Sequence, residues 1–114
     1  MNEGDVVLAS LPQSDGQLKF RPAVVLRQMP PFGDWLICGV STQLRQAAAN
    51  FDELIESKHD DFSASGLKAT SLIRLGFIAA LPANLIQGKI GAISPQRDRW
   101  LLDRLALHLR SPKM

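Results

Sequence analysis

The stretch Phe20-Arg21-Pro22-Ala23-Val24-Val25-Leu26 decides how the rest of this sequence is interpreted. Its run of four apolar residues includes two β-branched valines and predicts a buried strand that crosses the core of a small domain. Pro22 has no N–H group and favours an extended conformation for the residue before it, so we expect Arg21 at the mouth of this strand. A cation held at a rigid strand end can bind an anion. On this stretch alone, a solvated arginine or one paired with a carboxylate is the simpler interpretation.

The composition limits the kind of protein that the chain can form. A length of 114 residues fits one domain, residues 1–114, with one core. No apolar run approaches the ~20 residues of a membrane helix, so no membrane partner is expected. The segment Met1-Asn2-Glu3-Gly4-Asp5 has two acids and no basic residues, unlike a secretory signal, which predicts a cytoplasmic protein. The net charge of +2 is compatible with a nucleic-acid ligand but does not require one.

Cysteine and histidine are too few to suggest metal or disulfide chemistry. Cys38 is alone in an apolar run, which predicts a small buried side chain and excludes an internal disulfide. His59 stands beside Asp60 and Asp61, an arrangement that allows catalysis, although a solvated loop histidine is the simpler interpretation. We therefore expect neither a metal nor a cofactor.

Turn residues divide the chain into short apolar segments that are typical of a β fold. A turn-rich loop of about ten residues, 11–20, is expected between the first two strands. The segment 43–50 has helical propensity and 51–55 fits a helical turn or a short edge strand, so both remain open. The longest apolar segment is expected to bend or bulge at Gly76. The predicted strands are, in order, 6–9, 20–26, 35–40, 70–81 and 88–93.

A helix is predicted at the end of the chain. Ser94-Pro95 is a helix start, because serine caps free N–H groups and proline suits the first helical position. The helix is expected to run from residue 95 to about residue 110. One face should pack on the core, and Trp100 and Leu107 form a flanking stripe that fits either core or a subunit contact. The expected core face consists of Leu101, Leu102, Leu105 and Leu109. The predicted fold is mainly β with a C-terminal helix, a small barrel or half-barrel.

Short motifs follow one another in a fixed order along nearly the whole chain. They are Gly4-Asp5-Val6-Val7, Arg21-Pro22-Ala23-Val24-Val25-Leu26, Thr42, Gly66-Leu67, Ser71-Leu72-Ile73 and Lys89-Ile90-Gly91. In this order they resemble the PemK/MazF-like toxins of bacterial type II toxin–antitoxin systems. The resemblance implies an SH3-like β-barrel of the PemK/MazF/CcdB type, a homodimer and a cognate antitoxin. It also implies metal-independent, sequence-specific cleavage of single-stranded RNA, with operator DNA contacted only through the antitoxin complex.

The resemblance also implies catalytic residues. Arg21 matches the family's active-site arginine and Thr42 its active-site threonine. The implied reaction is attack of a ribose 2′-OH on the adjacent phosphorus, which leaves a 2′,3′-cyclic phosphate and a 5′-OH. A guanidinium suits this reaction because its planar fork donates to two phosphoryl oxygens and keeps its charge. Further contacts with the RNA are expected from Gln17, Lys19, Gln43 and Arg74.

The sequence departs from the family pattern where a general base is needed. The first loop has no histidine, and the acid of an Arg-x-Asp triplet is replaced by Gly76. Asp15, Lys19 or a substrate-assisted route all remain open as the proton acceptor. The simplest role for Arg74 is a structural ion pair with an acid such as Asp5. The alternative function is a catalytically degenerate barrel that acts by binding, such as a gyrase-poison-like toxin or a nucleic-acid-binding module.

Overall fold

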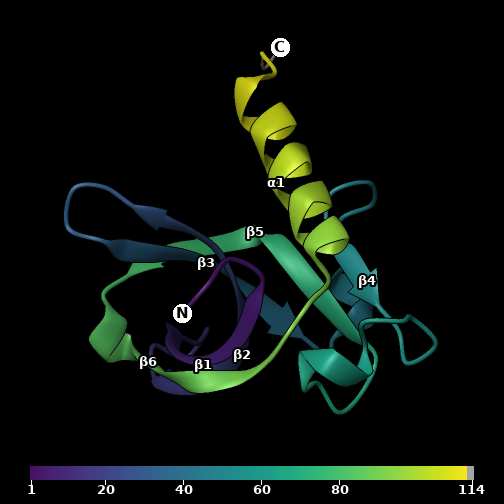
Figure 1. The fold of residues 1–114 in the computed structure, drawn as a ribbon, viewed down its shortest axis with the longest axis horizontal. Helices are drawn as coiled ribbons and strands as arrows, with labels where there is room; N and C mark the ends of the chain where they lie inside the picture. The colour runs from purple at the N-terminus through teal and green to yellow at the C-terminus, as the bar shows by residue number, and fades with distance from the viewer. Residues whose placement is uncertain (113–114) are drawn as a thin grey trace.

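The computed structural model describes residues 1–112, which form one curled antiparallel sheet and one α-helix (Figure 1). The strands pair in the order β4-β5-β3-β2-β1-β6, so β4 and β6 are the free edges of a barrel-like sheet that does not close. This confirms the predicted mainly β architecture with a C-terminal helix. The elements are β1 (Asp5–Pro12), β2 (Leu18–Met29), β3 (Asp34–Ser41), η1 (Leu44–Gln46), β4 (Glu53–Ile55), η2 (Ser63–Ser65), β5 (Ser71–Leu81), η3 (Ala83–Leu85), β6 (Ile86–Ala92) and α1 (Pro95–Arg110), where η marks a short 3-10 helix.

Strand β2 lies in the middle of the sheet, and its residues alternate between two core clusters. Ala23 and Val25 belong to one cluster and Val24 and Leu26 to the other, and all four side chains are fully buried. Because successive side chains of a strand point to opposite faces, the two clusters lie on opposite sides of the sheet. The first also holds Val7, Ala9, Leu11, Ile37 and Ile86, and the second, which α1 covers, also holds Val6, Cys38, Ile55, Ile73, Leu75, Ile93, Leu101 and Leu105.

The prediction of a loop of about ten residues between β1 and β2 is wrong. The two strands stay paired as far as Pro12 opposite Leu18, so only residues 13–17 form the turn. The reason is the period-2 pattern of β1, in which buried Leu11 continues the alternation past the polar Ser10. Within the turn, the Asp15 carboxylate accepts a hydrogen bond from the backbone N–H of Gln17 at 2.9 Å.

The predicted bulge in β5 is confirmed. Ile78 pairs with Cys38 whereas Arg74 pairs with the next residue, Gly39, so residues 75–77 lie outside the register. A bulge changes which side chains face each side of a sheet. Within the bulge, Leu75 packs in the cluster under α1, whereas Phe77 packs against the opposite cluster.

Residues 43–55, for which the sequence left helix and strand open, form a loop followed by a short strand. The short helix η1 is followed by a turn over residues 49–51, and β4 pairs with β5 through Glu53 opposite Ile73. Strand β4 is also tied to α1, because Nη1 of Arg97 on the helix lies 3.4 Å from Oε2 of Glu53 in the strand. The Nε of Arg97 also donates to Asp61 Oδ2 at 2.8 Å. The hydrogen bonds from Arg97 hold the pKa of Asp61 down at about 2, whereas burial raises the pKa of Glu53.

Helix α1 has the predicted bounds and the predicted cap. The Ser94 hydroxyl accepts a hydrogen bond from the N–H of Arg97 at 3.1 Å. Leu101 and Leu105 are buried as expected, but the expectation that Leu109 packs on the core is wrong. The last turns of the helix extend beyond the sheet, which leaves Leu109 exposed (Figure 1). No helix within residues 1–112 is long and apolar enough to span a membrane.

Candidate functional site

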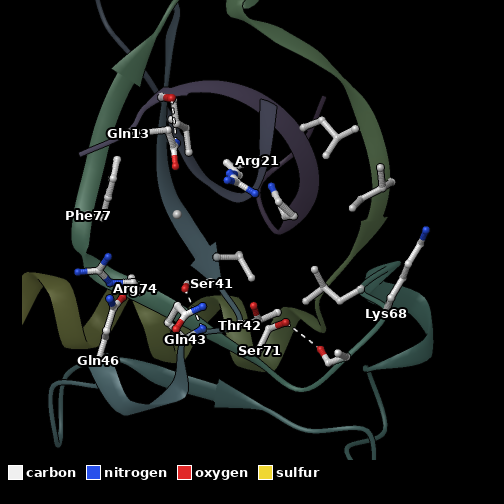
Figure 2. A pocket seen from close by; sticks show the side chains of 18 of the residues that line it. Gln13, Arg21, Ser41, Thr42, Gln43, Gln46, Lys68, Ser71, Arg74 and Phe77 are labelled. Atoms are coloured by element: carbon white, nitrogen blue, oxygen red, sulfur yellow. Dashed lines mark hydrogen bonds between the residues drawn. The ribbon is translucent and has the colours of Figure 1, made fainter. Parts of the chain in front are cut away.

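A groove of about 1180 Å³ opens where the β1–β2 hairpin, the end of β3, η1 and the start of β5 come together (Figure 2). Polar side chains from all these elements line it. Figure 2 places Arg21 near the centre, Arg74 and Phe77 on one side and Lys68 on the other. The groove therefore gathers residues that are far apart in the sequence.

Arg21 reaches the groove because β2 passes from exposed to buried residues at Pro22. Arg21 pairs with Ala9 of β1, and the fully buried run of β2 begins immediately after Pro22. The Arg21 side chain is exposed, and no carboxylate of the described residues lies in salt-bridge range of its guanidinium. Arg21 therefore lies within β2 rather than at the expected strand mouth, because β2 begins at Leu18, but it stands at the edge of the buried run and its charge is available to a ligand.

Thr42 enters the same groove from the turn after β3. The Ser41 hydroxyl accepts a hydrogen bond from the N–H of Gln43 at 3.0 Å, and Leu44 donates to the Thr42 carbonyl at 3.0 Å. These two hydrogen bonds fix the turn that carries Thr42 at the groove (Figure 2). The structure thus brings Arg21 and Thr42, twenty-one residues apart in the chain, to one cavity.

Two of the four residues expected to contact RNA line the groove and two do not. Gln43 and Arg74 are lining residues. Gln17 and Lys19 lie outside the lining, because the hairpin extends further than expected and Lys19 pairs with Leu11 within it.

Lys68 is a groove residue that sequence reasoning missed. It follows Gly66, which has φ of +74°, and a Cβ on Gly66 would collide with the backbone carbonyl of Ile90 in β6. Glycine therefore allows the loop to lie against β6 and holds Lys68 at the groove. The Gly66-Leu67 motif was the available signal. Other lining residues that the sequence did not single out are Gln13, Ser14, Gln46, Ser71 and Phe77.

The groove has cations, hydroxyls and amides but no acid. No aspartate, glutamate or histidine is among its described lining residues. Asp15 lies outside it, and His59 is occupied elsewhere, since its Nδ1 accepts the N–H of Glu56 at 2.8 Å. Residues 1–112 contain no cluster of three side chains able to hold a metal ion. Burial raises the pKa of the Cys38 thiol to about 12, so this residue offers no nucleophile.

The expected ion pair between Arg74 and Asp5 is wrong. Lys89 Nζ lies 3.3 Å from one oxygen of Asp5, and the N–H of Asn2 donates to the other at 2.9 Å. Arg74 lines the groove instead, where its Nε is buried without a hydrogen-bond partner among the described residues.

Comparison with known proteins agrees with this arrangement. The profile described as "PemK-like, MazF-like toxin of type II toxin-antitoxin system" matches residues 2–109. The chain belongs to this family. Membership makes it a toxin of the type II class, whose members are known as mRNA interferases and act with an antitoxin partner.

Comparison with solved structures supports the fold of this family member. The structure of Mycobacterium tuberculosis toxin MazF-mt6 aligns with a TM-score of 0.69 over 96% of this chain and 99% of that chain, at 14% identity. The predicted SH3-like, PemK/MazF-type toxin fold is thereby confirmed. A search of curated protein sequences gives no match.

A second hollow, of about 500 Å³, lies between the N-terminus and α1 and is a poorer place for an anion. Its lining includes three acids, Glu3, Asp98 and Asp103, against two arginines, Arg27 and Arg99. Burial, with a smaller contribution from Glu3, raises the pKa of Asp98 to about 6, while Arg27 acts in the opposite direction. Crowded carboxylates repel phosphate, so the groove around Arg21 is the candidate site.

The raised pKa of Asp98 predicts a pH-dependent stability. The folded protein binds this proton more tightly than the unfolded chain, so the stabilisation is present below about pH 4 and lost as the pH rises through about 6. We expect Asp98→Asn to raise the free energy of unfolding by about 1–2 kcal/mol at pH 7.5 and to change it little at pH 4. Urea titrations at both pH values measure this. Asp103→Asn, an exposed acid of the same helix, is the control, and an equal effect of Asp98→Asn at both pH values contradicts the assignment.

Proposed function

We propose that this protein is a metal-independent, sequence-specific endoribonuclease that cuts single-stranded RNA, such as mRNA, in the cytoplasm. The observation that supports this most strongly is the shared, acid-free groove of Arg21 and Thr42. A phosphodiester is an anion, and an exposed guanidinium without a carboxylate partner is suited to bind it. Family membership supplies the expectation that the bound ligand is RNA.

In the proposed reaction the ribose 2′-OH attacks the adjacent phosphorus and the 5′ oxygen of the next nucleotide departs. Negative charge grows on the phosphoryl oxygens, and Arg21 stabilises it with two parallel N–H donors. The Thr42 hydroxyl donates a further hydrogen bond to the same phosphate. The products are a 2′,3′-cyclic phosphate and a 5′-OH.

The protons need separate acceptors and donors. With no carboxylate or imidazole lining the described groove, we assign acceptance of the 2′-OH proton to a phosphoryl oxygen of the substrate itself. Lys68 is the protonated lining residue that we assign to the departing 5′ oxygen. We prefer this substrate-assisted route to Asp15 or Lys19 as the proton acceptor, because neither residue lines the groove.

The cleavage assay uses mixed-sequence single-stranded RNA in excess EDTA. Wild-type protein is expected to produce 2′,3′-cyclic phosphate and 5′-OH ends at preferred sites. Arg21→Ala should lower the rate roughly 100-fold or more, because it removes the main charge stabilisation. Thr42→Val should lower it about tenfold, as expected for one lost hydrogen bond.

Arg99→Ala is the matched control, because this exposed arginine lies on α1 outside the groove and should leave cleavage unchanged. Wild type and Arg21→Ala that are equally inert on varied RNAs would contradict the proposal.

A second function is favoured by one observation, the absence of an acid or histidine from the described groove lining. In this alternative the barrel is catalytically degenerate and acts by binding, as a gyrase-poison-like toxin or a nucleic-acid-binding module. Arg21→Ala would then stay toxic in cells whose RNA remains intact, with DNA-damage signalling in the gyrase case. The nuclease proposal instead requires that Arg21→Ala is not toxic and that the wild-type protein cuts cellular RNA.

We also propose that the protein is a homodimer whose antitoxin covers apolar surface, and that it contacts operator DNA only within that complex. The supporting observation is the helix stripe that the sequence left open between core and subunit contact. Trp100 and Leu107 are 54% and 62% exposed, so this stripe is not core within the described chain.

Light scattering at micromolar protein tests the dimer. We expect a molar mass of two chains, because apolar side chains exposed on a helix, such as Trp100 and Leu107, favour association. A monomer mass that does not change with concentration contradicts it.

A further inference from the structure

Three side chains of the groove have no role in the proposed reaction at the phosphate. Arg74, Phe77 and Gln46 all line the groove, and Figure 2 shows them on the side of Arg21 that faces away from Lys68. We propose that they form a binding site for one guanine base of the RNA strand, next to the phosphate that Arg21 holds. This inference rests on the proposed function, since it assumes that the groove binds RNA.

The bulge in β5 is the feature that builds this site. In a regular strand Arg74 and Phe77, three residues apart, would point to opposite faces of the sheet. Because residues 75–77 lie outside the register, Phe77 faces the same side as Arg74, and its ring lies against Gly39 of β3, the residue with which Arg74 pairs. Bulges recur next to binding sites for this reason: they re-aim a side chain.

Phe77 is held as a fixed stacking surface. A Cβ placed on Gly39 would meet ring carbons of Phe77 at 3.6 and 3.8 Å, so the ring lies against the β3 backbone at that glycine. The side chain is half-buried and also packs on the core cluster of Ile37 and Val25. A ring fixed in this way loses little entropy when a base stacks on it, and stacking of this kind strengthens the binding of any base.

Arg74 supplies donors that nothing in the described chain takes up. It pairs with no carboxylate, and its buried Nε has no acceptor. An unpaired buried donor is costly to the free protein, and a ligand that draws the guanidinium into a new set of hydrogen bonds can recover that cost. The terminal N–H groups of its fork are the donors left for a ligand.

The chemistry of the three side chains selects guanine among the bases. Guanine presents two acceptors, O6 and N7, that match two donors of an arginine fork. Adenine presents the N6 amino donor where guanine has O6, so it would place donor against donor. The Gln46 amide oxygen can accept from the N2 amino group that only guanine carries on its Watson–Crick edge.

The test measures binding rather than cleavage, so that it does not depend on the proposed reaction. The probes are 2′-O-methyl decamers of uridine with one central guanine, adenine or cytosine, which lack a free 2′-OH and cannot be cut by this route. Fluorescence anisotropy is expected to show wild-type protein binding the guanine decamer about tenfold more tightly than the adenine decamer. Circular dichroism and thermal unfolding confirm that each variant is folded.

Three variants separate recognition from charge. Arg74→Lys keeps the charge but loses the fork, so it should abolish the guanine preference while binding the all-uridine decamer within about twofold of wild type. Phe77→Leu should weaken all the decamers about tenfold, as expected for lost stacking. Arg99→Gln, an exposed arginine outside the groove, should change neither quantity.

Two results would overturn the inference. One is wild-type protein that binds guanine, adenine and cytosine decamers equally or binds none of them. The other is Arg74→Lys that keeps the full guanine preference, which would make Arg74 a contact to a second phosphate or a structural residue. A protein that prefers guanine here but leaves RNA uncut in EDTA retains the base site and refutes only the nuclease proposal.

Discussion

The complete burial of residues 23–26 of the central strand β2, on both of its faces, is the constraint on which the rest of the structure depends. Ala23 and Val25 pack into one core cluster while Val24 and Leu26 pack into the other, so the strand cannot slip by one residue without exposing both sets. Its register with β1 and β3 is thereby fixed, and the position of Arg21 at the start of the buried run is fixed with it.

Charge distribution then separates the groove from the rest of the surface. The acids that contact cations are used elsewhere: Asp61 and Glu53 with Arg97, and Asp5 with Lys89. The groove keeps Arg21, Lys68 and Arg74 without a neutralising carboxylate among the described residues. Such an arrangement costs stability in the absence of a ligand, which is the usual balance at a binding site.

The sequence predicted the elements whose signals are local. Serine before proline marked the start of α1, and β-branched runs marked the strands, because caps and strand propensity act within a few residues. The predicted length of the β1–β2 turn was wrong because Ser10 and Pro12 interrupt the apolar run, although the pairing of the two strands continues through both residues. Leu109 was misplaced because helical periodicity does not report where the sheet beneath a helix ends.

The site was less accessible to sequence reasoning than the fold. Arg21 was expected at a strand mouth from Pro22 alone, but its association with Thr42 came from the family resemblance. Lys68 and Phe77 were missed because each reaches the groove through backbone geometry, a positive-φ glycine in one case and a three-residue bulge in the other. The prediction that Arg74 pairs with Asp5 was wrong because a sequence does not reveal which cation lies nearest an acid, and in the structure Lys89 is the cation beside Asp5.

The proposed function requires that single-stranded RNA binds in the groove between Arg21 and Thr42. The most direct measurement is a two-dimensional amide NMR titration of the folded protein with an uncleavable 2′-O-methyl RNA of mixed sequence. We predict that the largest shifts fall on the backbone amides of Arg21, Thr42 and the loop of Lys68, with α1 unaffected. Shifts confined to α1 or to the hollow beside Asp98, with the groove silent, would contradict it.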